Sequence, residues 1–140
     1  MSAGEMRVVV EVEDVAEALK LYRDVLGLTQ VASFREGEAE VVLLEARRGT
    51  IELSNREQTL MIDRIETGRE IGSRFRIAFA VEDTRERTVA AESAGARLIG
   101  GPQLTPWGSL NSRLESADGL QLTLFQDHGE EEVWTGETAD

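Results

Sequence analysis

The chain has 140 residues and a formal net charge of -12, with 41% hydrophobic and 30% charged residues. This composition is typical of a single soluble domain, and no apolar run approaches the roughly 20 residues that cross a bilayer. The negative charge argues against nucleic acid or an anionic membrane as a partner, because both attract basic surfaces. Without cysteine or a secretory signal, we expect a cytoplasmic protein that has neither disulfides nor thiolate ligands.

The stretch from Arg7 to Leu28 begins as a strand and continues as a helix, and its opening pattern recurs in the second half. Arg7 aligns with Arg76 and, at the same offset, Val12–Asp14 aligns with Val81–Asp83. In each copy the apolar residues first alternate, as in a strand, and then recur at helical spacing. The chain is therefore predicted to contain one structural unit written twice.

Both predicted helices carry start and stop signals. Asp14 and Asp83 are the expected N-caps, each followed three residues later by a glutamate, and Gly27 and Gly95 are the expected ends. The apolar stripe expected to bury the first helix consists of Val15, Leu19, Tyr22, Val25 and Leu26.

Turn residues divide the rest of the chain into further elements. Strands are expected at 30–35, 39–46, 50–54, 75–81, 97–99, 109–115 and 120–126, and the second helix at 84–93. The triplet Gly100–Pro102 is expected to break the chain before the penultimate strand. Each half is thus predicted to have the order βαβββ.

These elements define a single domain over residues 1–126, with module one at about 6–54 and module two at about 75–126. Residues 55–74 are polar and are expected to form a linker with at most a short helical turn; this segment either only connects the modules or also closes over a pocket. Residues 127–140 are acidic and lack a pattern, so a mobile tail is expected there.

Three motifs identify a family resemblance. The strand–helix junction reads VEDVAEALKLYRDVLGL at 12–28, TPWG occupies 105–108, and the last hairpin reads SADGLQLTLFQ at 116–126. Together they resemble the vicinal oxygen chelate superfamily, which includes glyoxalases, bleomycin resistance proteins and extradiol dioxygenases. The resemblance implies an α+β fold in which two tandem βαβββ modules form a curved, cup-shaped mixed sheet with helices on the outside.

The resemblance also locates the position of a metal site. Metal-dependent members carry His, Gln or Glu ligands on the first and fourth strands of each module, and the matching residues here are Arg7, Glu52, Arg76 and Thr123. Arginine has no acceptor lone pair and threonine is a poor ligand, so only Glu52 suits a metal. We therefore expect neither a metal nor another cofactor, and we expect the single histidine, His128, to be solvated beyond the last strand.

Strand alternation extends the predicted binding surface. It directs Phe34, Asn111 and Arg113 towards the cup, and the TPWG turn places Trp107 nearby, either as pocket surface or as a plug at the module edge. Two interpretations of the charged residues stay open. Glu52 pairs with an arginine and holds the modules together, or one arginine neutralises Glu52 and the other binds an oxyanion of a ligand.

Three functions are compatible with these residues. The leading hypothesis is a metal-independent, homodimeric small-molecule-binding protein that sequesters a ligand in the cup. The alternative is a lyase, isomerase or dioxygenase-like enzyme in which Glu52 is the general base and Arg7 or Arg76 stabilises an oxyanion. The third is a noncatalytic assembly domain whose cup is filled by its own side chains.

Overall fold

The computed structural model describes residues 2–117 and 119–127. The strands are β1 Glu5–Glu11, β2 Thr29–Glu36, β3 Ala39–Ala46, β4 Gly49–Ser54, β5 Phe75–Ala80, β6 Arg97–Leu104, β7 Ser109–Glu115 and β8 Gln121–Asp127. The helices are α1 Val15–Leu19, which continues as the π-helix η1 Lys20–Val25, then α2 Arg56–Thr67 and α3 Thr84–Ser93. Asp127, expected to begin the acidic tail, is the last residue of β8, and residues 128–140, which include His128, lie outside the described residues.

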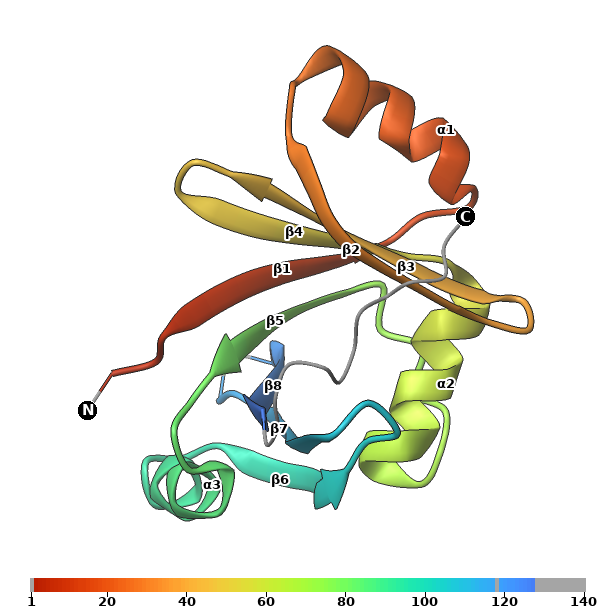
Figure 1. Cartoon of the computed structure of the whole chain (residues 1–140). Coiled ribbons are helices and arrows are strands. Elements are labelled where there is room, and N and C mark those ends of the chain that lie inside the picture. The colour runs from red at the N-terminus through yellow and green to blue at the C-terminus, as the bar shows by residue number, and fades with distance from the viewer. Residues whose placement is uncertain (1, 118, 128–140) are drawn as a thin grey trace.

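All eight of these strands form one curved, open sheet in the order β2-β3-β4-β1-β5-β8-β7-β6 (Figure 1). The two modules meet where β1 pairs antiparallel with β5, and in each module the first strand pairs parallel with the last, β1 with β4 and β5 with β8. The predicted fold class, an α+β protein built from two βαβββ modules around a curved mixed sheet, is confirmed.

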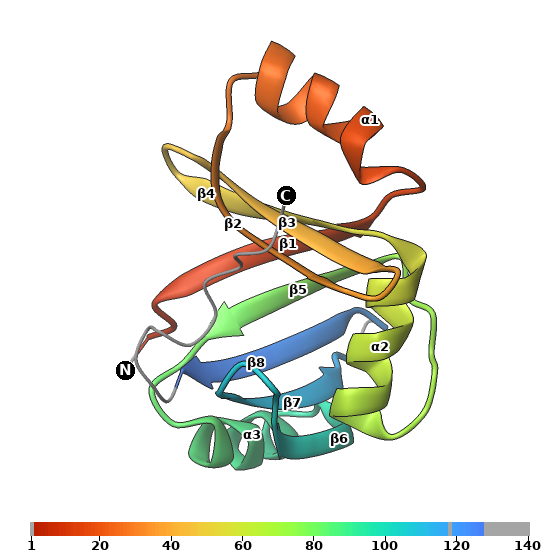
Figure 2. The same ribbon diagram turned by 45° about the vertical axis from the view of Figure 1, so that its right-hand side comes forward.

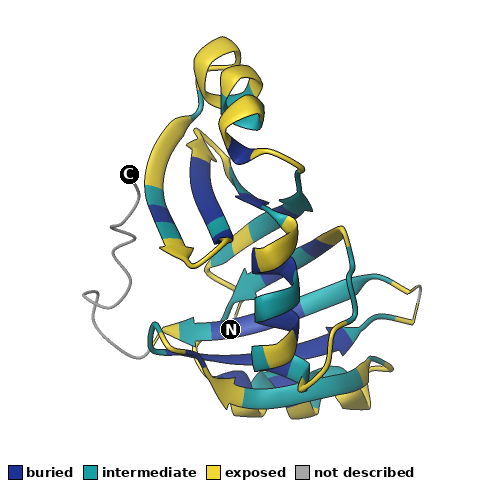
Figure 3. Cartoon of the chain, turned by 90° about the vertical axis from the view of Figure 1, so that its right-hand side faces the viewer, coloured by how far each residue is buried: buried dark blue, intermediate teal, exposed yellow. Residues whose placement is uncertain are grey.

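Two helices cover the outside of the sheet, one for each module. In module one, Val15 of α1 packs with Val42, Leu44 and Leu53 in a buried cluster. In module two, α3 lies against β6, β7 and β8. Figure 3 shows that burial is concentrated on the strands, whereas the outer side of α1 is exposed. No helix of the described residues is long and apolar enough to cross a membrane.

The predicted helix caps are confirmed in both copies. The Asp14 carboxylate accepts a hydrogen bond from the backbone N–H of Glu17, and Asp83 accepts one from Glu86, both at 3.1 Å. An N-cap of this kind satisfies one of the backbone donors that a helix leaves free at its first turn. The repeat therefore encodes the same local start signal twice.

The predicted apolar stripe of the first helix is only partly correct. Val15, Leu19 and Tyr22 pack against the core, but Val25 and Leu26 are 73% and 58% exposed. The helix widens after Leu19 into a π-helix, in which the N–H of Leu26 bonds to the carbonyl of Leu21. A π-helix has more residues per turn than an α-helix, so residues spaced for an α-helix no longer share a face.

The glycine–proline triplet does not end β6 as expected. The strand continues to Leu104 through two register irregularities and a cis Gly101–Pro102 peptide bond. The absence of a side chain at Gly100 lets the end of α2 approach closely, because a Cβ placed there would lie 2.3 Å from the carbonyl oxygen of Glu66. The glycine is thus required by helix docking rather than by a chain break.

The segment expected to be a linker contains the 12-residue helix α2. Asn55 caps its start by accepting from the N–H of Gln58 at 2.9 Å, and Gly68 ends it in the left-handed conformation with φ of 82°. Figure 2 shows α2 standing across the strand ends of both modules, and it contacts β3, β4, β6 and β7. The helix therefore joins the two halves of the sheet as a wall.

Candidate functional site

The concave side of the sheet holds a cavity of about 380 Å³. Its walls come from both modules, from α2 and from the turn before β7. The sequence-predicted residues that line it are Arg7, Phe34, Glu52, Arg76, Trp107, Asn111 and Thr123. The remaining lining residues are Val31, Ala32, Val41, Leu43, Gln58, Ile62, Glu66, Ala78, Gly108, Ser109, Phe125 and Asp127.

Strand register places the four positions expected from the family metal site around the floor of this cavity. Val9 of β1 lies opposite Glu52 of β4 on one side and opposite Arg76 of β5 on the other. Ala78 lies opposite Arg7 and, on its other side, opposite Thr123. The alternation predicted for the inward face therefore matches the side chains that line the cavity, because adjacent strands in register keep their inward residues level.

Arg7 is held mainly by its own strand. Its guanidinium donates to both carboxylate oxygens of Glu5 at 3.0 and 3.2 Å, and it lies 4.7 Å from the centre of the Phe125 ring. The contact to Glu52 is looser, at 3.9 Å. Burial acts to lower the pKa of Arg7, but the hydrogen bond to Glu5 and the charges of Glu52, Glu5 and Asp127 outweigh it and raise the pKa.

Arg76 is placed differently. It is 7% exposed, and its Nη1 donates to the hydroxyl of Thr123 at 2.9 Å, whereas within residues 2–117 and 119–127 it makes no ion pair. The Thr123 hydroxyl in turn donates to Glu66 at 3.0 Å. A buried cation with a single neutral partner is costly unless a further group or solvent reaches it. Its open side is the cavity.

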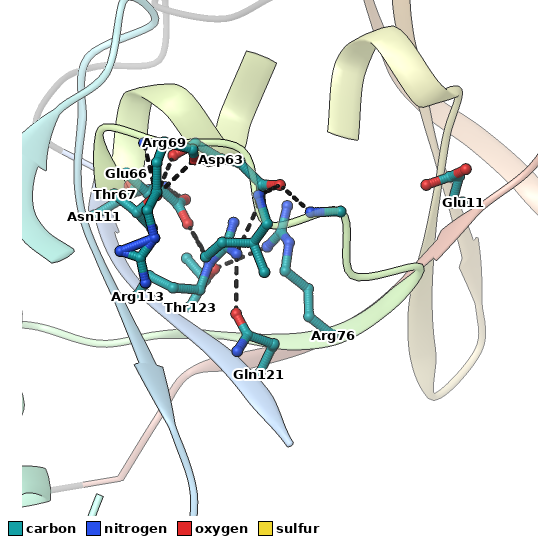
Figure 4. A network of polar contacts seen from close by, with 12 residues as sticks. Glu11, Asp63, Glu66, Thr67, Arg69, Arg76, Asn111, Arg113, Gln121 and Thr123 are labelled. Carbon is teal, nitrogen blue, oxygen red and sulfur yellow. Dashed lines mark hydrogen bonds and ion pairs between the residues drawn. The ribbon is translucent and has the colours of Figure 1, made fainter. Parts of the chain in front are cut away.

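The expectation that Arg113 is part of the binding surface needs correction. Arg113 is 0% exposed and does not line the cavity, because it lies between the carboxylates of Asp63 at 2.9 Å and Glu66 at 2.8 Å (Figure 4). Nη1 of Arg113 also donates to Gln121 at 3.1 Å, and Nη2 of Arg113 has no hydrogen-bond partner among the described residues. Its place behind Glu66 makes it a support for the cavity wall.

Asp63 and Glu66 were missed by the sequence analysis. The Glu66 carboxylate accepts from Asn111 at 2.7 Å as well as from Arg113 and Thr123, so both of its oxygens are engaged. Asp63 also accepts from the backbone N–H groups of Ile71 and Gly72, which fixes the segment after α2.

The signal that could have revealed this wall is a stripe along α2. Gln58, Ile62 and Glu66 follow one another at helical spacing, and all three line the cavity. The cap residues Asn55 and Gly68 mark the ends of the same helix. The stripe was overlooked because two of its three members are polar, and hydrophobic periodicity detects only apolar faces.

Two aromatic side chains that line the cavity, Phe34 and Trp107, are in contact with each other. Phe34 lies on the edge strand β2, and Trp107 lies in the turn between β6 and β7 at the other edge of the open sheet. Their ring centres are 5.5 Å apart at an interplanar angle of 59°, a favourable tilted arrangement. Both expected roles of Trp107, pocket surface and a plug at the module edge, stay predictions that this position allows.

The residues around the floor do not fit a divalent metal. The family ligand positions offer one carboxylate, two guanidinium groups and one hydroxyl. The two positively charged guanidinium groups therefore repel a divalent metal ion. Across the described part of the chain there is no group of three or more His, Cys, Asp and Glu side chains that could hold a metal ion. No reaction step is therefore derived through a metal at these four positions.

Solved structures share this architecture at low sequence identity. An uncharacterised protein from Bacillus halodurans matches with a TM-score of 0.71 and 19% identity, covering 94% of this chain and 99% of that one. Methylmalonyl-CoA epimerase from Mycobacterium tuberculosis matches with a TM-score of 0.66 and 19% identity, covering 92% and 94%.

A methylmalonyl-CoA epimerase variant from Streptomyces coelicolor, in complex with 2-nitronate-propionyl-CoA, matches with a TM-score of 0.62 and 17% identity, covering 91% and 100%. At these identities the structures establish the shared fold and not a shared activity. No curated protein sequence matches the chain significantly.

The family itself is established by a sequence model. The model for the glyoxalase/bleomycin resistance protein/dioxygenase superfamily matches residues 6–132, which includes both modules and α2. The sheet order, the paired βαβββ modules and the cavity between them agree with that match. The chain therefore belongs to the glyoxalase/bleomycin resistance protein/dioxygenase superfamily.

Proposed function

We propose that this protein is a metal-independent small-molecule-binding protein that sequesters its ligand in the cup. The observation that carries the proposal is Arg76, a buried guanidinium that faces the cavity without an ion pair among the described residues. A cavity of about 380 Å³ falls within the size range of small-molecule sites. The third hypothesis, an assembly domain with a filled cup, is less favoured because the side chains of residues 2–117 and 119–127 do not fill this space.

The proposal includes the homodimer expected from the sequence. Its support is a set of exposed apolar side chains on and beside η1, namely Leu21, Val25 and Leu26. Contiguous apolar surface of this kind is typical of interaction sites.

We expect the protein to bind no divalent metal at the cup. Isothermal titration with Co²⁺, Zn²⁺, Mn²⁺ and Fe²⁺ should give no stoichiometric binding, since Arg7 and Arg76 repel a cation at the ligand positions.

In the same buffer with a chelator, native mass spectrometry after incubation with a metabolite extract should detect a retained small molecule that is recovered chemically unchanged.

Matched variants assign that result to the cup. Arg76→Gln should lose the retained molecule. Arg35→Gln should keep it, because Arg35 is an exposed residue of β2 that pairs with Glu40 of β3. Stoichiometric metal binding that disappears in Glu52→Gln contradicts metal independence. Retention of the molecule by Arg76→Gln contradicts the cup as its site.

A second candidate function is proton transfer next to a carbonyl group, and the surroundings of Glu52 favour it. This carboxylate lines the cavity, and within the described part of the chain it forms an ion pair only with Arg7, at 3.9 Å, beyond hydrogen-bond distance. Glu52 can therefore remove an α-proton, and Arg76 can stabilise the resulting enolate oxygen by hydrogen bonding.

Deuterium incorporation tests this alternative. With methylmalonyl-CoA as probe, chosen for the epimerases of the same fold, NMR in D₂O with a chelator should show exchange at the α-carbon above the rate without protein. Glu52→Gln should reduce the exchange by about 100-fold or more, because general-base catalysis contributes that much. Glu45→Gln, an exposed change on β3, is the control. An unchanged rate in Glu52→Gln rejects the alternative.

A further inference from the structure

We infer that the ligand of the cup is an aromatic or similarly bulky apolar carboxylic acid, with its carboxylate on Arg76 and its apolar body against β2 and β3. This inference rests on the small-molecule-binding function proposed above. It adds the chemical class of the ligand and the direction in which the ligand lies.

The walls of the cavity differ in polarity from strand to strand, because β1 and β4 contribute the charged Arg7 and Glu52 whereas β2 and β3 are apolar. Strands β2 and β3 contribute only apolar side chains, and Ile62 of α2 and Trp107 extend the same surface. The apolar lining from β2 and β3 is Val31, Ala32, Phe34, Val41 and Leu43. The polar lining from module two is Arg76, Ser109, Asn111, Thr123 and Asp127. A ligand that fills this space needs one apolar region and one polar end, since each unmatched polar group would lose a hydrogen bond.

The cation available to that polar end is Arg76, although the cavity lining also holds Glu52, Glu66 and Asp127. Glu66 is neutralised by Arg113 and by hydrogen bonds to both of its oxygens, as Figure 4 shows. The charges of Glu52 and Asp127 act on Arg7, which is already bound by Glu5. Arg76 is thus the cationic group of the cavity without a carboxylate, and a planar guanidinium binds a carboxylate in a bidentate manner.

A second uncommitted group lies on the same cavity. Gln58 is 4% exposed, it lines the cavity from the first turn of α2, and its Oε1 has no hydrogen-bond partner in the part of the chain that the structure describes. Buried polar atoms are nearly always satisfied, so an orphaned one at a cavity wall indicates a missing partner. Because the amide oxygen and nitrogen exchange places by rotation, Gln58 can donate to a carboxylate or accept from a ligand hydroxyl.

A panel of related probes tests the ligand class. The probes are 4-biphenylacetate, its neutral amide, the cationic 4-biphenylmethylamine, and acetate as the head group alone. Titration calorimetry on the full chain should give binding of the acid that is tighter than that of the amide or the amine by about tenfold or more. Acetate should bind too weakly to detect, because it buries no apolar surface.

Variants then locate the two ends of the probe. Arg76→Gln should abolish the preference for acid over amide while the amide still binds, and Arg76→Lys should keep part of that preference because the charge remains. Trp107→Ala should weaken acid and amide alike, and Arg35→Gln is the matched surface control for the lost charge.

The outcomes separate this inference from the function on which it rests. Equal binding of acid and amide, or tighter binding of the amine, overturns the carboxylic-acid class but leaves a small-molecule site. If no probe binds and the metabolite-extract experiment also retains nothing, the small-molecule function itself fails. The wild-type comparison needs no variant, so it stays decisive even if an Arg76 variant does not fold.

Discussion

Replacing Arg113 by methionine should destabilise the protein by about 3–5 kcal/mol, the cost of leaving one side of a buried ion pair without its partner. The arginine is 0% exposed and is shared by Asp63 and Glu66, so the variant buries two carboxylates without a cation. Urea unfolding followed by circular dichroism, at fixed pH and ionic strength, measures the change. Because Glu66 lines the cavity, probe binding should weaken in the same variant.

Two comparisons show whether charge is the cause. Arg97→Met removes an exposed arginine that pairs with Glu115, and it should cost less than about 1 kcal/mol. The triple variant Asp63→Asn, Glu66→Gln, Arg113→Met removes all three charges and should recover part of the lost stability. A loss below about 1 kcal/mol for Arg113→Met alone would contradict a supporting role for this buried network.

Gly100→Ala should push the end of α2 away from β6 and destabilise the protein by about 1–3 kcal/mol, the usual cost of overpacking a close contact. The added Cβ would lie 2.3 Å from the Glu66 carbonyl oxygen and 2.6 Å from the Cα of Thr67, and both atoms are backbone. Because the substitution displaces the end of α2, local opening of this helix should become easier, and hydrogen exchange at its backbone amides should become faster.

Gly49→Ala is the matched control for this change. Gly49 is also a strand residue, the first of β4, but a Cβ there would meet nothing within 4 Å. Its free energy of unfolding and its α2 exchange rates should match those of the wild type. If Gly100→Ala behaves like Gly49→Ala, the close approach of α2 to β6 is not a constraint on the fold.

The fold could be predicted because its determinants are local. Alternating residues, the caps Asp14 and Asp83, and the repeated order of elements each depend on neighbours along the chain. The inward parity of Arg7, Glu52, Arg76 and Thr123 followed from strand alternation and the family resemblance, and all four line one cavity. Their roles in binding or catalysis stay predictions until a ligand is measured.

The wall formed by α2 could not be predicted in the same way. The buried face of this helix includes Gln58, Asp63 and Glu66, so it has no apolar stripe. Polar residues of this kind are normally solvent-exposed, and burial is tolerated here because partners elsewhere satisfy them. Glu66 bonds to Arg113 and Thr123, which are 47 and 57 residues away along the chain.

The sequence by itself determined the two-module sheet, the side of each strand that faces the cup, and the poor match of the metal-ligand positions to a cation. Only the tertiary structure decided that residues 56–67 form a wall, that Arg113 supports this wall, and that Arg76 faces the cavity without an ion pair to any described residue. The physical reason is that strand parity and helix caps are short-range properties, whereas the pairing of buried charges depends on which distant segments the folded sheet brings together.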